Sequence, residues 1–515
     1  MHTLHGLKEF AKFTKQVLTI EEMRAVDMNT TALGVSQNEL MDNAGRAVAE
    51  FVSKKFTGEK RILIVCGRGK NGGDGFTAAK HLCKKYDVKV ALLGNREEIN
   101  PDSKFHLNSI SQIPTIAIIE NAEQLITQLL GECDVVIDAI FGTGFHGKMR
   151  EGASNAIDAI NSSKKVVVAV DVPSGLTEDG QNKKIVNADY TLTYHKMKAQ
   201  LVRNRSAGKV IVVAVGIPID AEIIAGPGDL YLASVPRGKY SSKKENGKAV
   251  IIGGSKNIHG APSLASNSAY STLAALRVGI GYTITCVPRS IANIVRKVSP
   301  NIIVIETESQ DISTADLPIL QRAAKSADSV VIGPGLGRAQ ESLAAAASLV
   351  AYLSKLGKML VVDADAIYSI NSSIKLGSKT ILTPNDKEFS HLSSTKMRKG
   401  NLKSRIRAAV RAANHFGTNI LLKGHQTIVT DGKVVKIILS NSSALATMGT
   451  GDVLSGIIAG YAARKKDMLI SATAGAYLHA RIGDELYVDE GTHILASDII
   501  ERIPKIIKEF DKNVI

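Results

Sequence analysis

Aromatic residues are scarce in this sequence of 515 residues: they make up 4% of the chain, and tryptophan is absent. Proteins that bind single-stranded nucleic acid stack successive bases on aromatic side chains. The composition therefore argues against a nucleic-acid binder, and the sequence contains no RNP-type RNA-binding motif. We expect no nucleic-acid partner.

Cysteines and long apolar runs are lacking as well. The four cysteines are scattered and form no CxxC pair, so neither a zinc site nor a disulfide framework follows from them. The longest apolar run, residues 210–219, is well short of the ~18 residues that cross a membrane. Residues 1–15 contain lysine and glutamate but no apolar core, and we interpret them as a short extension rather than a signal peptide. We expect a cytoplasmic protein with no membrane partner.

Positive charge, by contrast, is in excess and unevenly distributed. The formal net charge is +15; residues 1–225 hold 28 basic and 26 acidic side chains, whereas residues 226–515 hold 36 and 23. A basic second half indicates an anionic partner, for which a phosphorylated small molecule suffices. Residues 398–411 (RKGNLKSRIRAAVR) are a basic stretch that we interpret as a solvated helix face.

The length indicates two domains, because a single hydrophobic core rarely grows beyond ~250–300 residues. Val/Ile-rich runs alternate with helical patterns in both halves, which is typical of a parallel sheet covered on both faces. The polar stretch 237–248 (RGKYSSKKENGK) is the best candidate linker. We expect an extension over 1–15, one α/β domain over 16–236, the linker over 237–248, and a second α/β domain over 249–515.

The expected strands are short and apolar. In the first half they cover residues 61–66, 89–93, 135–138, 166–171 and 210–215, with helices over 21–51 (broken at Gly34), 78–85 and 122–130. In the second half they begin at Ala249 and include residues 282–287, 329–332, 359–363, 381–382 and 419–422.

A glycine-rich segment, VCGRGKNGGDG at residues 65–75, follows the first expected strand. Its glycines allow a sharp turn and a close approach of backbone N–H groups to a ligand. The helix expected after it favours a phosphate at its N-terminus. A tight turn without a ligand is the alternative.

Two further strand ends carry polar side chains. Asp138 follows one strand in VVIDAIFGTGFHGK, and Asp171 and Ser174 follow the next in VAVDVPSG. The carboxyl ends of parallel strands form the binding crevice of an open sheet. Asn71, Asp138 and Ser174 offer only hard oxygen ligands, which suit an alkali or alkaline-earth cation. A helix cap at Asp138 and a turn at Ser174 are the alternatives.

In combination, KNGGDG, DAIFGTG and DVPSG, with LMDNAGRAVAE (residues 40–50) ahead of them, resemble the NAD(P)H-hydrate epimerase domain over about residues 16–225. The resemblance implies a Rossmann-like fold and a potassium ion, K+, bound by Asn71, Asp138 and Ser174. Asp171 is the candidate for proton transfer. The implied substrate contacts are Lys70, Asn71, Gly72, Gly73, Asp74, Gly142, Thr143, Gly144, Phe145, His146, Gly147, Lys148 and Asp171.

The segment ALATMGTGDVLSG (residues 444–456) carries the second group of candidates. Gly449, Thr450 and Gly451 form a backbone nest at the start of an expected helix, where amides stabilise a transferring phosphoryl group. Asp452, in the first turn, is placed to take a proton from an attacking hydroxyl. An aspartate that only favours the helix dipole is the alternative.

Other strand ends supply partners for this segment. Asn385 and Glu388, three residues apart in LTPNDKE, suit Mg²⁺ held through water. Lys423 and Thr427 in KGHQT suit nucleotide phosphates, the GPGLG loop lets a flat ligand approach the backbone, and VDADA brings two aspartates to a strand end. A capped turn is the alternative for each.

From about residue 248 to 507 the chain resembles the ADP/ATP-dependent NAD(P)H-hydrate dehydratase, a relative of ribokinase-like kinases. The resemblance rests on IIGGS, HGAPSLA, RVGIGY, GPGLG, DADAI, LTPxxxE, KG and ATMGTGDVLSG. It implies a ribokinase-like fold, Mg²⁺ with ADP or ATP, and Asp452 as the catalytic base. The implied substrate contacts are Ala261, Gly337, Asn385, Glu388 and Asp452, and the nucleotide contacts are Lys423, Gly424, Thr427, Met448, Gly449, Thr450 and Gly451.

Together the resemblances imply a bifunctional enzyme that repairs hydrated NADH and NADPH (NADHX and NADPHX). An isomerase activity would interconvert the two epimers, and a lyase activity, with ADP the expected nucleotide, would dehydrate the S epimer to NAD(P)H. We expect a homo-oligomer. The alternative is a ribokinase-like kinase for a small molecule such as a vitamin precursor, fused to a noncatalytic Rossmann-like binding module. Asn385 keeps it open, because the dehydratase family normally has His-Pro-Gly-Glu there, whereas Asn-x-x-Glu is typical of the kinases.

Overall fold

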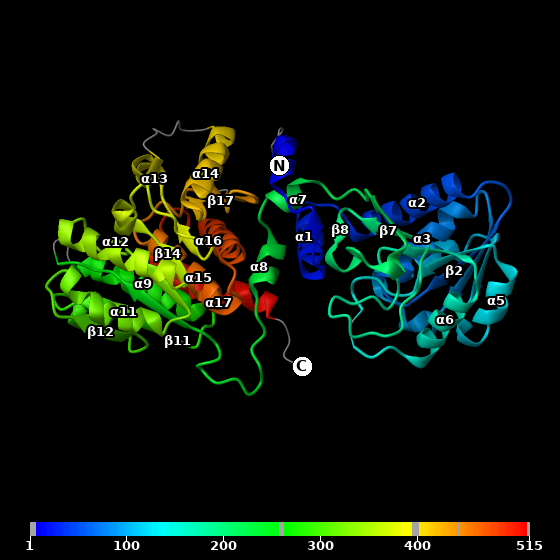
Figure 1. The fold of residues 1–515 in the computed structure, drawn as a ribbon, viewed down its shortest axis with the longest axis horizontal. Helices are drawn as coiled ribbons and strands as arrows, with labels where there is room; N and C mark the ends of the chain where they lie inside the picture. The colour runs from blue at the N-terminus through cyan, green and yellow to red at the C-terminus, as the bar shows by residue number, and fades with distance from the viewer. Residues whose placement is uncertain (1–6, 146, 257–261, 394–400, 441, 512–515) are drawn as a thin grey trace. The chain divides into compact units, whose positions relative to one another are not determined.

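The computed structural model describes residues 7–145, 147–256, 262–393, 401–440 and 442–511. The chain forms two compact units (Figure 1). The N-terminal unit is Lys15–Pro218, and the C-terminal unit is Ile219–Ile515 together with Met1–Thr14. In each unit helices cover both faces of one large sheet, so the expected α/β fold class is confirmed for both.

Seven parallel strands form the sheet of the N-terminal unit, in the order β4-β3-β2-β5-β6-β7-β9. They are β2 (Arg61–Cys66), β3 (Asp87–Leu92), β4 (Ile116–Ile119), β5 (Val135–Ala139), β6 (Val166–Val170), β7 (Tyr190–Tyr194) and β9 (Lys209–Val213). The short strands β1 (Val17–Leu18) and β8 (Met197–Lys198) pair separately. The strand order reverses between β2 and β5, which is where sheets of this kind bind ligands.

The alternation of side chains along β2 explains why both faces of this sheet are covered. Ile62 and Ile64 enter one hydrophobic cluster with α2, α3 and α4, whereas Leu63 and Val65 enter another with α5 and α6. The helices of the unit are α1 (Ile20–Ala32), α2 (Gln37–Lys55), α3 (Lys70–Leu82), α4 (Pro101–Ile110), α5 (Ile126–Glu132) and α6 (Glu151–Ser162), with 3-10 turns at Arg96–Glu98, Ala122–Gln124, Ala199–Leu201 and Arg205–Ala207.

Nine strands form the sheet of the C-terminal unit, in the order β12-β11-β10-β13-β14-β15-β16-β17-β18. The strands are parallel as far as β16, and β17 and β18 are antiparallel additions. They are β10 (Lys248–Ile252), β11 (Tyr282–Pro288), β12 (Ile303–Thr307), β13 (Ser329–Ile332), β14 (Met359–Val362), β15 (Thr380–Leu382), β16 (Asn419–Leu422), β17 (Gln426–Thr430) and β18 (Val435–Leu439).

Helices also cover both faces of this second sheet. Val250 and Val330 pack in a cluster with α11, α12 and α14, whereas Ile251 and Val331 pack with α9, α15 and α16. The helices are α7 (Asp220–Ile223), α8 (Pro227–Ala233), α9 (Pro262–Arg277), α10 (Ala292–Val298), α11 (Leu317–Lys325), α12 (Gln340–Lys355), α13 (Asp386–Ser393), α14 (Leu402–Phe416), α15 (Thr450–Lys465), α16 (Met468–Glu490) and α17 (Ala496–Ile507), with 3-10 turns at Leu7–Phe13, Thr314–Asp316, Ala364–Ser369 and Lys508–Phe510.

The boundaries of the units differ from those expected from the sequence. The N-terminal unit ends at Pro218 rather than at residue 236, and residues 237–248 belong to the C-terminal unit instead of forming a linker. The Gly281 N–H donates to the carbonyl oxygens of Asn246 and Gly247, and Asn246 is buried. This polar stretch is therefore fixed against the start of the second sheet.

Residues 219–236 join the C-terminal unit because they bury apolar side chains in it. The Ala225 N–H donates to the Ile437 carbonyl oxygen of β18, and α8 packs on α16 with Leu230 fully buried. Burial of one leucine stabilises the fold by ~1.5–3 kcal/mol. A boundary at residue 236 would lose that contribution.

The first residues of the chain are also part of the C-terminal unit rather than a free extension. Leu7 and Phe10 are buried in the cluster that contains Ile406 of α14. Glu9 forms salt bridges with Lys403 (2.7 Å) and Arg407 (3.1 Å) on the same helix. The chain thus begins in one unit, forms the other, and returns.

Each expected strand is confirmed to within two residues; the two-residue strands β1 and β8 were not expected, nor were five strands of the large sheets. These five, β4, β7, β12, β17 and β18, are edge or near-edge strands, and most carry polar residues. In β7, for example, the fully buried residues Thr191 and Thr193 are polar. The strand therefore lacks the apolar run by which buried strands were recognised in the sequence.

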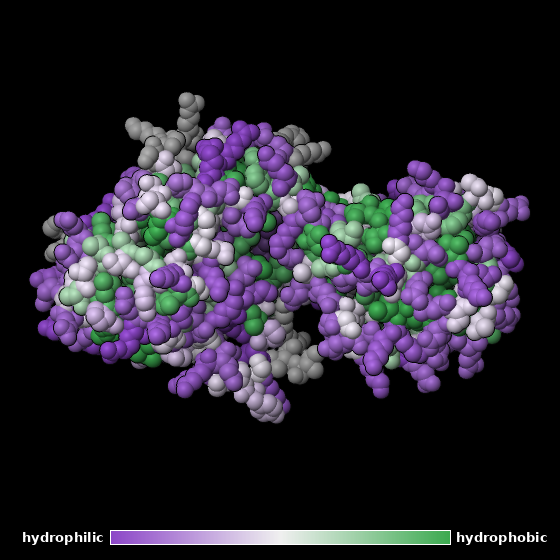
Figure 2. Space-filling model, in the orientation of Figure 1, coloured by the Kyte–Doolittle hydropathy of each residue, from purple (hydrophilic) through white to green (hydrophobic). Residues whose placement is uncertain are grey.

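None of the helices in the described parts of the chain combines the length and the hydropathy that a membrane span requires. On the face drawn in Figure 2, hydrophilic residues cover much of the surface of each unit, with hydrophobic residues between them.

Candidate active sites in the two units

The first candidate site lies at the carboxyl ends of β2, β5 and β6 in the N-terminal unit. These three strands are neighbours in the sheet. Asp138 is near the end of β5, and Asn71 and Asp171 lie in the segments that follow β2 and β6, so the three side chains start from one edge of the sheet.

The segment KNGGDG is the beginning of helix α3, not a loop as expected. The helix starts at Lys70. Its glycines are required for close packing: a Cβ at Gly72 would lie 1.9 Å from the Gly67 carbonyl oxygen, and one at Gly73 would lie 2.4 Å from Met41 Sδ. The N-terminus of α3 is thereby held at the sheet edge, where its free N–H groups favour an anion.

Asp138 and Ser174 are bonded to each other beside Asn71. The Ser174 hydroxyl and N–H donate to the two carboxylate oxygens of Asp138, at 2.5 and 2.8 Å, and Ser174 Oγ accepts the Phe141 N–H at 2.8 Å. A Cβ at Gly142 would lie 3.0 Å from Asn71 Oδ1. Burial raises the pKa of Asp138 to about 6, although these hydrogen bonds oppose the shift. The three predicted cation ligands therefore come together, and two of them also stabilise a turn.

Asp171 is held in an uncommon backbone conformation at the end of β6. Its φ is +63°, a region that costs a residue with a side chain ~1 kcal/mol or more. Its Oδ1 lies 3.0 Å from Nζ of Lys198, which is only 1% exposed and also donates to the Tyr194 carbonyl oxygen at 2.6 Å. A buried ammonium needs such a partner. The salt bridge fixes the direction of the Asp171 carboxylate.

Two more carboxyl groups, Asp74 on α3 and Asp27 on α1, interact with this pair. Burial, with the charge of Asp171 next, raises the pKa of Asp74 well above its usual value. Burial raises the pKa of Asp27 to about 6, and the charge of Lys198 opposes that shift. The Tyr194 hydroxyl is buried and, among the described residues, has no hydrogen-bond partner. Lys198 is thus grouped with three carboxyl groups, Asp171, Asp74 and Asp27, and burial raises the pKa of the last two.

The remaining predicted contacts of the first site are more exposed. Phe145 stacks on Phe141 with the ring centroids 4.3 Å apart, and Lys70 Nζ donates to Gln37 Oε1 at 3.0 Å. His146 lies outside the described residues. The predicted residues that follow β2, β5 or β6 are Lys70, Asn71, Gly72, Gly73, Asp74, Gly142, Thr143, Gly144, Phe145, Gly147, Lys148 and Asp171.

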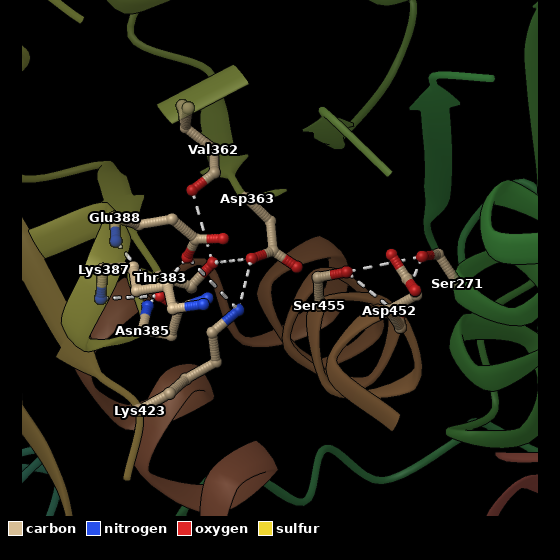
Figure 3. Close-up of polar contacts among 10 residues, drawn as sticks. All are labelled: Ser271, Val362, Asp363, Thr383, Asn385, Lys387, Glu388, Lys423, Asp452 and Ser455. Carbon is tan, nitrogen blue, oxygen red and sulfur yellow. Dashed lines mark hydrogen bonds and ion pairs between the residues drawn. The ribbon is translucent and has the colours of Figure 1, made fainter. Parts of the chain in front are cut away.

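The second candidate site lies at the carboxyl ends of β13 to β16 in the C-terminal unit, where four neighbouring parallel strands end. Figure 3 shows the polar residues around it. The GPGLG loop follows β13, Asp363 follows β14, Asn385 follows β15, and Lys423 follows β16.

Lys423 is the centre of this site. Its Nζ donates to Asp363 Oδ1 at 2.8 Å, and the same oxygen accepts the Thr383 hydroxyl at 2.7 Å (Figure 3). Glu388 Oε2 lies 4.0 Å from Lys423 Nζ. Burial lowers the pKa of Lys423, but the charges of Asp363 and Glu388 outweigh it and raise that pKa. Lys423 therefore stays a cation.

Asp452 lies in the first turn of α15. The helix starts directly after Gly449, whose φ is +88°. Burial raises the pKa of Asp452 to about 7; the charge of Asp363 adds to the shift and that of Lys423 opposes it. A Cβ at Gly451 would lie 3.6 Å from Lys423 Nζ. The Lys423 ammonium group is therefore close to the predicted backbone nest as well as to the Asp452 carboxyl group.

Two serines fix the backbone at Asp452. The hydroxyls of Ser271 on α9 and Ser455 on α15 donate to the Asp452 carbonyl oxygen at 2.7 and 3.0 Å. These bonds use the main chain rather than the carboxyl group. They connect the start of α15 to α9, which packs along it.

Asn385 and Glu388 form a reciprocal cap at the start of α13. Asn385 Oδ1 accepts the N–H groups of Lys387 and Glu388 at 2.9 and 3.1 Å, and Glu388 Oε2 accepts the Asn385 N–H at 2.7 Å. The Asn385 oxygen is therefore used within the turn, which is the expected alternative to a metal ligand. Burial raises the pKa of Glu388.

Asp365 holds the GPGLG loop. Its Oδ2 accepts the Gly337 N–H at 3.0 Å, and its Oδ1 accepts Arg338 Nε at 2.8 Å. Gly337 has a φ of +79°, and a Cβ there would lie 3.1 Å from Ser255 Oγ, a buried hydroxyl with no hydrogen-bond partner within the described ranges. The loop backbone is thus placed close to an unpartnered polar atom.

The other predicted nucleotide contacts lie beside Lys423 in sequence or at the nest. Thr427 Oγ1 donates to the Gly424 carbonyl oxygen at 3.1 Å, and Met448, directly before the nest, is 68% exposed. Ala261 lies outside the described residues. In the part of the chain that the structure describes, no three His, Cys, Asp or Glu side chains are grouped to hold a metal ion.

Four residues at these sites were missed from the sequence: Asp27, Tyr194, Lys198 and Arg405. Asp27 and Lys198 reach the first site through contacts distant in sequence, and no local pattern signals them. Arg405 lies four residues before buried Ala409 on α14. That helical spacing was a usable signal that one basic residue of residues 398–411 faces inward rather than solvent.

Known proteins match both units. The NAD(P)H-hydrate dehydratase family model matches residues 249–505, and the model of the YjeF-related protein N-terminus matches residues 37–200. The bifunctional NAD(P)H-hydrate repair enzyme Nnr of Pyrobaculum aerophilum is 36% identical over 507 residues, which are 96% of this chain and 98% of that protein. The chain belongs to the family of bifunctional NAD(P)H-hydrate repair enzymes.

A second member of the repair-enzyme family and one solved structure are also similar to this chain. The protein of the same name from Archaeoglobus fulgidus is 37% identical over 495 residues, with 96% of this chain and 98% of that protein covered. A solved ADP/ATP-dependent NAD(P)H-hydrate dehydratase from Bacillus subtilis, co-crystallized with ATP/Mg2+, is 23% identical, with 54% of this chain and 96% of that chain covered at a TM-score of 0.44. The two full-length relatives and the two family models confirm the family resemblance found in the sequence.

Proposed function

We propose that this protein repairs hydrated NADH and NADPH in two steps. The N-terminal unit interconverts the two epimers of the hydrate, and the C-terminal unit dehydrates the S epimer with consumption of ADP or ATP. The observation that carries the proposal is the position of Asp452, a buried carboxyl group next to a backbone nest and a lysine. Membership of the repair-enzyme family supports the substrate class.

The dehydration begins with phosphorylation of the hydroxyl on the reduced nicotinamide ring; phosphate then leaves as the ring nitrogen supplies electrons. Asp452 takes the hydroxyl proton, and a pKa of about 7 suits a base that works near neutral pH. The N–H groups of Gly449, Thr450 and Gly451 and the Lys423 ammonium stabilise the negative charge on the transferring phosphoryl group.

The nucleotide binds beside Lys423, which Asp363 holds in place. Mg²⁺, bound with the nucleotide, neutralises phosphate charge, and the carboxylates of Asp363 and Glu388 are the hard oxygen ligands nearest to Lys423. The Asn385 cap orients Glu388 toward this lysine. The proposed nucleotide contacts are Lys423, Gly424, Thr427, Met448, Gly449, Thr450 and Gly451, and the GPGLG backbone at Gly337 accepts the flat ring of the hydrate.

The epimerisation uses an acid and a base. Inversion of the carbon that bears the hydroxyl requires one bond at that carbon to break and reform, with one proton supplied and one withdrawn. Burial and the charge of Asp171 raise the pKa of Asp74 well above its usual value, and Asp74 is the proposed acid. Asp171, paired with Lys198, is the proposed base.

A potassium ion fits beside these residues. Asn71 Oδ1, the Asp138 carboxylate and Ser174 Oγ present oxygens around residues 141–142. K+ when bound supplies a positive charge for the hydrate's phosphates. Because the pKa of Asp138 is about 6, acid weakens its binding. Replacing K+ by a large organic cation is expected to slow epimerisation and leave dehydration unchanged in wild type, and Asp138→Asn is expected to make epimerisation insensitive to K+.

The function is tested by mixing the purified full-length protein with both epimers of hydrated NADH, Mg²⁺ and ADP or ATP. We expect the absorbance of NADH to appear, with release of inorganic phosphate. A stable phosphorylated product without NADH would instead identify a ribokinase-like kinase. No turnover with either nucleotide would contradict the proposal.

A further inference from the structure

Arg405 is a buried cation in a helix whose other basic residues face solvent. It is 7% exposed, whereas Arg407 and Arg411 on the same helix are exposed. A buried charge is costly to the fold unless its hydrogen bonds are satisfied. The partners of this guanidinium group are therefore informative about its role.

The guanidinium group joins two of the strand-end segments of the second site. One terminal nitrogen donates to Asp386, the first residue of α13, and the other donates to the Lys423 carbonyl oxygen at 3.0 Å. The Lys423 N–H donates in turn to the Pro384 carbonyl oxygen at 2.8 Å. The main chain of Lys423 is thus held from both sides, on its N–H by the segment after β15 and on its carbonyl by Arg405.

The residue after Lys423 shows how close this contact is. A Cβ at Gly424 would lie 2.5 Å from the Arg405 guanidinium nitrogen. The guanidinium group therefore occupies the space that a side chain would need at that position. The position requires glycine because of Arg405, not because of its own backbone conformation.

We propose that Arg405 is a positioning residue for Lys423, and that through it the enzyme keeps the lysine ammonium between Asp363 and the nest at the start of α15. This inference rests on the proposed function of Lys423 at the nucleotide phosphates. A flexible lysine side chain needs a fixed main chain to keep its charge within the ~1 Å that phosphoryl transfer tolerates. Arginine suits this role because its planar guanidinium group holds two donor nitrogens in a fixed fork, whereas the three donors of lysine share one nitrogen on a flexible stem.

The test uses the full-length chain with Arg405→Met, Arg405→Lys and, as the matched control on the exposed face of α14, Arg411→Met. We expect both Arg405 variants to raise the nucleotide KM by about tenfold, while the KM for the hydrate changes by less than about twofold. Arg411→Met is expected to behave as wild type. Epimerase activity of the same preparations reports that the rest of the chain is folded.

A pH profile separates positioning from a merely structural role. The Lys423 charge lowers the pKa of Asp452, so a displaced lysine shifts the acid limb of kcat/KM for dehydration to higher pH, by about half a unit or more. Arg411→Met is expected to leave the limb unchanged. A loss of stability alone lowers the rate at all pH values and does not move the limb.

A second variant tests the positioning role if Arg405→Met does not fold. The side chain of Asp386 is 41% exposed, so Asp386→Asn removes the charged partner of Arg405 without changing a buried residue. We expect it to raise the nucleotide KM less than the Arg405 variants do. Lys423→Met serves as the reference. If Lys423→Met leaves the nucleotide KM unchanged, the proposed function of Lys423 is wrong. If Lys423→Met raises it but the Arg405 and Asp386 variants do not, the positioning role is wrong.

Discussion

The two sites share one arrangement of charges but use it differently. Each contains a lysine paired with a carboxylate, Lys198 with Asp171 at 3.0 Å and Lys423 with Asp363 at 2.8 Å. Each also contains an acid whose pKa is raised mainly by burial, Asp74 in one and Asp452 in the other. The difference lies in which member of each set meets the substrate.

Exposure of the lysine distinguishes the two cases. The side chain of Lys198 is 1% exposed and that of Lys423 is 21% exposed. We propose that the enclosed Lys198 only orients its carboxylate partner, which leaves proton transfer to Asp171. Lys423 remains accessible beside a backbone nest, so in the proposed mechanism it binds phosphate itself, and the second carboxyl group, Asp452, is the base. On this proposal the same pair of residue types serves proton transfer in one unit and phosphoryl transfer in the other.

The largest effect is expected for Asp452→Asn, which removes the base but retains the nest and Lys423. The dehydration rate is expected to fall by ~10²–10⁴-fold, while nucleotide binding and the epimerisation rate stay close to wild type. NADH formation, nucleotide affinity and epimer exchange, measured on one preparation, check this. A dehydration rate within tenfold of wild type would show that Asp452 is not the base.

A smaller loss, confined to the other unit, is expected for Lys198→Met. Without the ammonium, Asp171 loses the partner that fixes its direction, so epimerisation is expected to slow by about 100-fold while dehydration of the S epimer is unaffected. Lys198→Arg is expected to restore part of the rate, and Lys196→Met, two residues away and less buried, is the matched control. If Lys198→Met epimerises as fast as wild type, the enclosed lysine has no role in orienting Asp171.

The pH dependence of dehydration tests the assignment of Asp452, rather than Lys423, as the base of the second site. Asp452 must be ionised to accept a proton, and its pKa is about 7; kcat/KM is therefore expected to fall by about tenfold per pH unit below that value. The profile is measured with the S epimer alone, so that epimerisation does not contribute. A rate that stays constant down to pH 5.5 would be incompatible with this base.

The smallest effect concerns stability. The pKa of Asp452 is raised in the folded state from 3.8 to about 7, so ionisation above pH 7 disfavours folding, and this penalty disappears below pH 4, where the group is protonated in both states. Asp452→Asn is expected to stabilise the C-terminal unit at pH 8 by about 1–3 kcal/mol and to raise its melting temperature by a few degrees. The gain is expected to shrink as the pH falls from 7 to 4. A variant less stable than wild type at pH 8 contradicts the prediction.

The polar residues at the strand ends were predicted well from the sequence, but the charged residues that contact them were predicted poorly. Apolar runs located the strands, and the carboxyl ends of parallel strands share one edge of a sheet, so Asp138, Asp171 and Lys423 were placed by pattern alone. Lys198 and Asp27 were missed because burial of a charged residue is decided by contacts distant in sequence, whereas the helical spacing of Arg405 was a usable signal. The domain boundary at residue 236 was wrong for a related reason: the apolar side chains of 219–236 pack on α16, which lies over 200 residues later.

Some features predicted from the sequence stay predictions: the potassium ion, the homo-oligomer and the cytoplasmic location. The glycines of KNGGDG teach a more general point. A cluster of glycines was interpreted as a sharp turn, but in α3 these residues allow the helix to pack against the preceding strand and loop at a distance that a Cβ would prevent. Composition indicated a glycine-dependent feature, and only the packing identified which one.

The central claim, that the two units perform separate steps, is tested most directly with the full-length Asp171→Asn variant. Both epimers of hydrated NADH are supplied with Mg²⁺ and nucleotide, and NADH absorbance is followed over time beside the wild type. We predict that the wild type converts the mixture in one continuous phase, whereas the variant converts the S epimer at the wild-type rate and then continues only as fast as spontaneous epimerisation supplies more. Complete conversion by Asp171→Asn at the wild-type rate would contradict the account.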